Sequence, residues 1–140
     1  MPMIDVYVTT GTFDDTKALT QQLAAALMRV EQVPDISLFR QNTAAFVHEL
    51  PPRALSNVDG DSDHVRVQVL TNAGALIDRD KQLAAVAELT RIVADAAGDP
   101  TLAARTWVLL TEAPDGGWGI AGHANLNAEL VAAARAQLGS

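Results

Sequence analysis

The sequence of 140 residues has the length of one compact domain, and with 49% hydrophobic and 19% charged residues it can bury a sizeable core. The net charge of −7 and the scattered arginines argue against nucleic-acid binding, which needs clustered cations to displace counterions. With no cysteine and three widely separated histidines, neither a disulfide nor a metal site is expected. No signal peptide and no run of transmembrane length is recognisable, so we expect a cytoplasmic protein with no membrane partner.

The first half of the chain shows the periodicities of a strand, a helix and a second strand. Residues 3–9 alternate between apolar and polar side chains, which predicts a half-buried strand. Residues 37–50 are expected to be extended, and Pro51 and Pro52 end that segment. Between them, apolar residues at three- and four-residue spacing predict a helix from about residue 15 to residue 30: Leu19, Leu23, Leu27 and Val30.

The second half repeats this pattern after a polar, turn-rich linker at residues 56–63. Residues 65–70 alternate as a strand, and Asp78 opens a helix that stops at Gly98. Residues 107–110 form an apolar run of strand length, and residues 128–138 have helical composition. The apolar positions of the second helix include Leu83, Val86, Leu89 and Val93.

The elements therefore follow the order β-α-β, linker, β-α-β and tail, with an offset of about 61 residues between Ile4 and Val65. Such units predict one α/β (α+β) domain over residues 1–140, in which a four-stranded sheet carries both helices on one face. Module one covers about 2–50, the linker about 51–63, module two about 64–124 and the C-terminal helical tail about 125–140. The open face of the sheet needs a cover, and another copy of the chain is the simplest one, so a homo-oligomer is expected.

Pro2 is the first candidate catalytic residue. A small penultimate residue is compatible with removal of Met1, which leaves proline as a secondary amine at the chain terminus. An α-amino group titrates at about 7.7 to 8.0, and desolvation brings that pKa closer to 7, where a general base works best. The alternative is that proline at this position only protects the terminus. The repeat offset pairs Pro2 with Asp63, which has no free amine, so one site per chain is expected.

A glycine-rich segment at residues 112–122 surrounds Trp118 and predicts a hairpin that presents this ring. Together with Pro2 ahead of the first strand, it resembles the tautomerase superfamily, whose type member is 4-oxalocrotonate tautomerase. At this length the chain is similar to fused two-unit members such as the cis-3-chloroacrylic acid dehalogenases and the malonate semialdehyde decarboxylases. The resemblance implies a cofactor-independent enzyme with a catalytic amino-terminal proline, Trp118 as an aromatic pocket wall, and a trimer.

The arginines that hold a substrate carboxylate in these families are missing from their usual places. Thr12 stands after the first strand of module one, Ala73 and Leu76 stand at the corresponding place in module two, and Trp107 occupies the place of an arginine in the last strand. The chain therefore lacks the paired hydrogen bonds that such arginines supply, unless other residues replace them.

Four residues are candidates for binding substrate in place of those arginines. Arg40 is expected at the start of the second strand, near the pocket rim, and Arg105 on the same strand face as Trp107. Asn72, in the turn after the third strand, could donate a hydrogen bond to an oxyanion. The alternatives are a structural charge for each arginine, a turn residue for Asn72 and a core position for Trp107.

These observations predict a tautomerase in which Pro2 transfers a proton on a small enol or 2-oxo acid. A hydratase, decarboxylase or dehalogenase of the same superfamily, with Pro2 protonated and acting as an acid, is an alternative. A second alternative is an oligomeric small-ligand binding protein that has lost turnover. Retention of Met1 would leave the Pro2 nitrogen as an amide and exclude both catalytic hypotheses.

Overall fold

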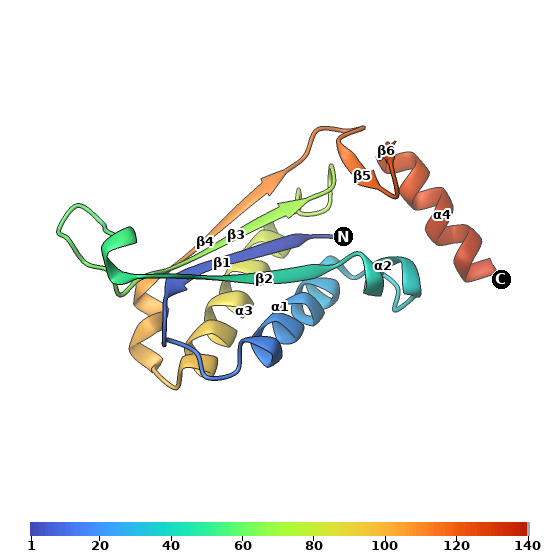
Figure 1. Ribbon diagram of the computed structural model, residues 1–140. Helices are drawn as coiled ribbons and strands as arrows, with labels where there is room; N and C mark the ends of the chain where they lie inside the picture. Colours follow the sequence, from blue (N-terminus) through green and yellow to red (C-terminus); the bar gives the residue numbers. More distant parts are fainter. Residues whose placement is uncertain (140) are drawn as a thin grey trace.

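The computed structural model describes residues 1–139 and contains a four-stranded sheet in the order β2-β1-β3-β4. Figure 1 shows the two long helices, α1 (Thr16–Glu31) and α3 (Arg79–Ala97), side by side on one face of this sheet, while the other face carries no helix. The predicted arrangement of two β-α-β units in one sheet is therefore confirmed.

The first unit begins with β1 (Met3–Thr9), which lies parallel to β2 (Ala44–Leu50). The Asp15 side chain caps α1 by accepting a hydrogen bond from the Ala18 N–H at 2.9 Å. The sequence prediction was wrong between these elements, because Ser37–Gln41 forms a short helix, α2, rather than extended chain. Five residues are too few to show a helical period, and this segment therefore reads as extended in the sequence.

The second unit follows the linker, which includes a 3-10 turn at Pro52–Ala54. It contains β3 (Val65–Thr71), α3, a 3-10 segment at Pro100–Arg105 and β4 (Thr106–Glu112), with β3 and β4 parallel. Asp78 caps α3, and Gly98 ends it at a positive φ of 63°. Of the apolar positions of this helix, Leu89 and Val93 are buried, whereas Leu83 is 52% exposed and Val86 is 38% exposed. The buried residues of α3 are Ala85, Leu89, Ile92, Val93 and Ala94.

The two units meet through β1 and β3, which are antiparallel and pair Met3 with Leu70 and Tyr7 with Arg66. The valines and isoleucine on the helix side of these strands are fully buried against α1 and α3: Ile4, Val6, Val8, Val65, Val67 and Val69. Burying each such side chain stabilises the fold by about 1.5–3 kcal/mol. Because the central pair is antiparallel, the start of β1 and the start of β3 lie at opposite ends of the sheet.

The C-terminal part lies beyond one end of the sheet. Two short strands, β5 (Trp118–Ile120) and β6 (His123–Asn125), form a separate hairpin, and α4 (Asn127–Gly139) follows. Figure 1 shows α4 beyond the end of the sheet at which the N-terminus lies, near α2. The Leu38 N–H donates a hydrogen bond to the Gln137 side chain at 2.9 Å and ties α2 to α4.

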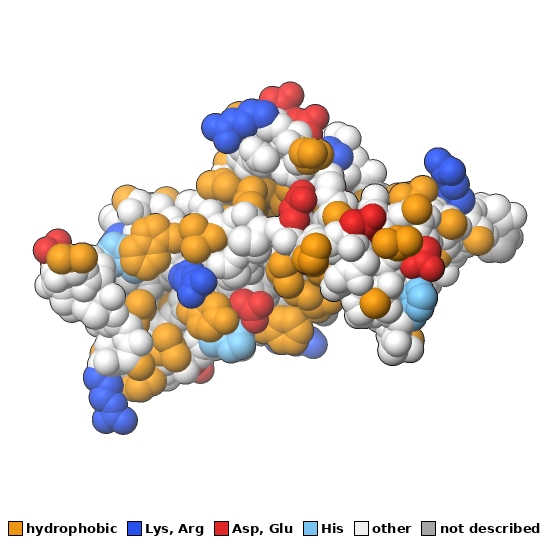
Figure 2. Space-filling model, turned by 90° about the horizontal axis from the view of Figure 1, so that it is seen from above, with side chains coloured by type: hydrophobic (Ala, Val, Ile, Leu, Met, Phe, Trp, Pro, Cys, Tyr) orange, Lys and Arg blue, Asp and Glu red, His pale blue; other side chains and the backbone are white. Residues whose placement is uncertain are grey.

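The open face of the sheet carries apolar side chains, among them Phe46, Leu70, Trp107 and Leu109, each at least 38% exposed. Figure 2 shows hydrophobic side chains spread over this face with a few charged groups among them. His48 contacts Asp5 there at 2.6 Å. Among residues 1–139, no helix has the length and apolarity needed to cross a membrane.

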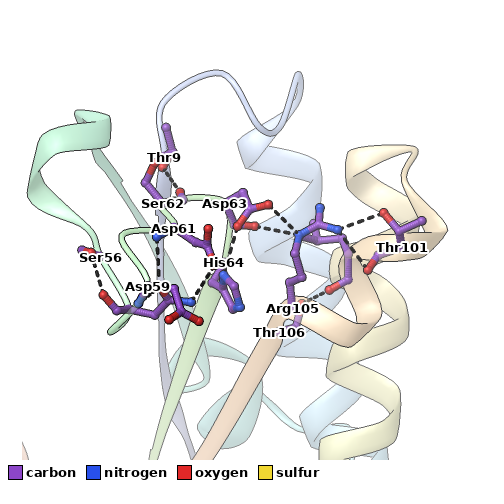
Figure 3. A network of polar contacts seen from close by, with 12 residues as sticks. Thr9, Ser56, Asp59, Asp61, Ser62, Asp63, His64, Thr101, Arg105 and Thr106 are labelled. Atoms are coloured by element: carbon purple, nitrogen blue, oxygen red, sulfur yellow. Dashed lines mark hydrogen bonds and ion pairs between the residues drawn. The ribbon is translucent and has the colours of Figure 1, made fainter.

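The end of the sheet opposite the N-terminus is closed by a polar network around Arg105 (Figure 3). Its guanidinium donates to the Asp63 carbonyl at 3.1 Å, to the Thr101 hydroxyl at 2.9 Å and to the Asp99 carboxylate at 3.1 Å. The Thr9 hydroxyl donates to the Ser62 carbonyl at 2.6 Å. The Arg105 bonds hold the end of the linker against the 3-10 segment before β4, and the Thr9 bond holds it to the end of β1.

Candidate active site

The start of the chain is buried in a second hydrophobic cluster, separate from the main core. Met1 is 2% exposed and packs with Trp118 and Leu130, which are 7% and 5% exposed. Pro2 is buried as well, and its carbonyl accepts a hydrogen bond from the Ala44 N–H at 3.2 Å. The pairing of β1 with β2 thus extends to Pro2 and fixes the backbone of the first residues.

The terminal amine of Met1 faces two polar side chains from different elements. It donates to Glu31 Oε2 at 3.4 Å and to Asn72 Oδ1 at 3.2 Å. The amide of Asn72 in turn donates to Asn127 Oδ1 at 2.9 Å, which links the turn after β3 to the start of α4. The chain start therefore lies where the end of α1, the turn after β3 and the start of α4 meet.

Burial changes the protonation of this amine and of Glu31 in opposite directions. Desolvation lowers the pKa of the Met1 amino group, and the nearby Glu31 carboxylate only partly opposes this. Desolvation raises the pKa of Glu31, again opposed in part by the amine and by Lys81. Both directions favour the uncharged forms of the amine and of the carboxyl group.

A cavity of about 360 Å³ opens beside these groups, a size that suits a small organic molecule. Its lining is mainly apolar and comes from the N-terminus, the segment after α1, the turn after β3 and one side of α4. The polar lining residues are Glu31, Asn72, Lys81, Asn127 and Arg135.

Glu31 was not predicted from the sequence, although a signal was present. Leu19, Leu23 and Leu27 follow one another at four-residue spacing along the buried face of α1, and Glu31 occupies the next position of that series. A carboxylate at a core position is the observation that indicates a site. Lys81 of α3 and Arg135 of α4 were missed as well, because nothing in the sequence shows that these two helices reach the chain start.

Two of the predicted site residues lie beside the N-terminus. Asn72 contacts the Met1 amine directly, and Trp118 packs against Met1. The hairpin around Trp118 forms as expected, and its ring is 7% exposed and packs against Met1. Gly117 is needed just before it, because a Cβ there would lie 2.9 Å from the Pro114 carbonyl oxygen.

The other three predicted binding residues lie elsewhere in the single chain. Arg40 belongs to α2 instead of a strand, is exposed, and pairs with Asp35 at 2.7 Å, so the expected position at the start of a strand was wrong. Arg105 belongs to the network at the opposite end of the sheet. Trp107 lies on β4 opposite Arg66 of β3. The β4 residue at the level of Met3 is four residues further along, so Trp107 lies roughly 13 Å from that level at the usual strand rise.

No family model matches the chain, and no curated protein matches it either. Solved structures do match. A fused 4-OT, solved as a symmetric trimer, has a TM-score of 0.71 at 19% identity, over 86% of this chain and 93% of its own. The chain has the fused tautomerase fold. A member of the cis-3-chloroacrylic acid dehalogenase family has the same TM-score and identity, over 91% of this chain and 87% of its own.

The same tautomerase fold occurs in malonate semialdehyde decarboxylase, with a TM-score of 0.67 at 16% identity over 94% of this chain and 97% of that one. These neighbours include tautomerase, dehalogenase and decarboxylase members of the superfamily. Among residues 1–139 of this chain, no three His, Asp or Glu side chains converge as metal ligands would.

Proposed function

We propose that the chain is a tautomerase in which Pro2, freed by removal of Met1, transfers a proton on a small enol or 2-oxo acid. The observation that carries this proposal is the burial of the chain start beside an apolar cavity of about 360 Å³. An N-terminus without a function usually lies in solvent, where its charge is hydrated. Here the terminal nitrogen instead faces a site lined by two polar side chains.

The geometry suits a general base. The neutral nitrogen of Pro2 would remove a proton from the carbon next to a carbonyl group, and the negative charge that develops on oxygen would be stabilised by polar groups of the cavity. Asn72 lies next to this place, because its Oδ1 accepts from the amine of the residue attached to Pro2. Its Nδ2 donates one hydrogen to Asn127 and has a second hydrogen that an oxyanion would accept. Trp118 would become an apolar wall that keeps water from the base.

A homo-oligomer, with a trimer favoured, is part of this proposal. The open sheet face exposes Phe46, Trp107 and Leu109, side chains that another copy of the chain would cover. Fused 4-OT neighbours form trimers, symmetric in one case and asymmetric in another. In such an assembly Trp107 and Arg105 would bind substrate at the cavity of a neighbouring copy.

The test begins with the intact mass of the purified protein, which reports whether Met1 has been removed. Ketonisation of phenylenolpyruvate is then followed for the wild type, Pro2→Ala and the matched control Pro100→Ala, whose proline lies at the far end of the sheet. General acid–base catalysis contributes about 10²–10⁴-fold, so we expect kcat/KM to fall by about that factor in Pro2→Ala alone. Equal rates in all three proteins would exclude Pro2, and binding without turnover would support a ligand-binding protein.

A further inference from the structure

The carboxylate of Glu31 is buried, lines the cavity and is only partly satisfied. Glu31 is 5% exposed, and its Oε2 atom lies 3.4 Å from the Met1 amine. Its Oε1 atom is buried and has no hydrogen-bond partner among residues 1–139. Leaving a buried carboxylate oxygen unpaired costs about 1–3 kcal/mol or more, so a structural role does not account for it.

The local structure makes this position still less favourable for a negative charge. Glu31 is the last residue of α1, where the helix dipole favours cations and disfavours anions. The nearby ammonium of Lys81 donates to the Glu31 backbone carbonyl at 3.1 Å rather than to its carboxylate. Buried ionisable groups beside a cavity are concentrated at functional sites.

Met1 marks the space between this carboxylate and Pro2. Its backbone connects the Pro2 nitrogen to the amine that contacts Glu31 and Asn72, and its side chain fills the space beside Trp118. When Met1 is removed, the same space separates the proline nitrogen from the Glu31 carboxylate. The H–C–C=O unit of a small carbonyl compound has a similar number of atoms to the Met1 backbone and could span the two groups.

We propose, building on the proposed function, that Glu31 is the second acid–base group of the site and exchanges a proton with the carbonyl or enol oxygen of the substrate. In ketonisation, the enol O–H bond breaks and its proton passes to the Glu31 carboxylate. The C=C pair takes a proton from the protonated Pro2 nitrogen, and C=O forms. Neutral Pro2 and protonated Glu31 remain. Pro2 then takes up a proton from water and Glu31 releases one to water, which restores the starting state.

This assignment also fixes how the substrate lies. A substrate carboxylate cannot point at Glu31, because two carboxylates in a site of low polarity repel each other. The reacting oxygen therefore faces inward, toward Glu31 and Asn72, and any carboxylate of the substrate faces Arg135. The charged groups that face Glu31 or line its cavity are the terminal amine before β1, Lys81 of α3 and Arg135 of α4.

The experiment compares Glu31→Gln, Glu31→Asp and the matched control Glu49→Gln, whose carboxylate is exposed on β2 at the far end of the sheet. With phenylenolpyruvate as the probe, kcat/KM should fall about 100-fold in Glu31→Gln, and one limb of its pH profile should disappear. Glu31→Asp should keep that limb at a partly reduced rate. Glu49→Gln should match the wild type in both respects, and circular dichroism checks that each variant is folded.

A second measurement needs no substrate. The Pro2 nitrogen, labelled with ¹⁵N, is titrated by NMR in the wild type and in Glu31→Gln. The carboxylate stabilises the protonated amine, so its removal should lower the pKa of Pro2 by about one unit. An unchanged titration, or an unchanged pH profile in Glu31→Gln while Pro2→Ala is inactive, overturns the role of Glu31 and leaves the proposed function standing. Full activity of Pro2→Ala, or a retained Met1, overturns the proposed function itself.

Discussion

Glu31 ends α1 with a carboxylate that lies among apolar residues, beside the terminal amine of Met1. Each of the two groups is disfavoured in its charged form by burial, and each partly restores the charge of the other. Such a pair does not stabilise the fold as a simple salt bridge would, because the cost of desolvating both ions can equal or exceed their attraction. Its consequence for stability can be measured.

We expect Glu31→Gln to remove a pH dependence of folding stability. Burial raises the pKa of Glu31 in the folded chain above its unfolded value of about 4.3, so its stabilising contribution is fully present below that pH. The contribution is lost as the pH rises through the folded pKa, by about 1.4 kcal/mol for each unit of difference. Urea unfolding at pH 4.5 and pH 8 should show this decline in the wild type and not in the glutamine variant. The same decline in both proteins would contradict it.

At the scale of elements, the sequence was sufficient where the pattern was long and regular. The bounds of β1 follow from the alternation of apolar and polar side chains. The N-terminal caps of α1 and α3 follow from Asp15 and Asp78, respectively. Short or alanine-rich segments were harder to predict. Helix α2 has only five residues, and the alanines of α3 let Ala85 face the core in place of Leu83. Small side chains carry little information about which face of a helix is buried.

The candidate site could be predicted only in part, because its members come from elements that the sequence does not connect. Pro2 precedes a recognisable strand, Asn72 follows one, and Trp118 lies in a recognisable hairpin. Lys81 and Arg135 reach the cavity only through the placement of α3 and α4 in three dimensions. Arg40 and Arg105 were chosen for their charge, and each is paired with nearby carboxylates instead.

The hairpin that carries Trp118 offers a test with a matched control. In Gly117→Ala the new Cβ would meet the Pro114 carbonyl and ring, so the turn must shift, at an expected cost of about 1–3 kcal/mol for overpacking. Gly119 has no atom within 4 Å of its Cβ position and no positive φ, so Gly119→Ala should be nearly neutral. Urea unfolding, with Trp118 fluorescence in a Trp107→Phe background, measures both. Equal stability of the two variants would show that the turn is not constrained.

At the scale of the whole molecule, the open sheet face predicts how assembly can be disrupted. Leu109→Glu places a charge among the exposed apolar side chains of β4, and we expect it to convert the proposed oligomer to monomers. Leu83→Glu is the control, because Leu83 is 52% exposed on α3, on the helix side of the molecule. Sedimentation velocity gives the mass of each. An oligomer that survives Leu109→Glu unchanged would place the interface elsewhere.

The network around Arg105 occupies the place in the second half of the fold that the N-terminus occupies in the first half. The repeat offset that matches Pro2 with Asp63 also matches Ala44 with Arg105, and both pairs are joined by hydrogen bonds to a backbone carbonyl. At this position the first half has the chain terminus and a cavity. The second half has ion pairs of Arg105, which hold the linker that connects the two halves. The two repeats therefore differ at the same position: the first has a buried chain start beside a cavity, and the second has ion pairs that fix the end of the linker.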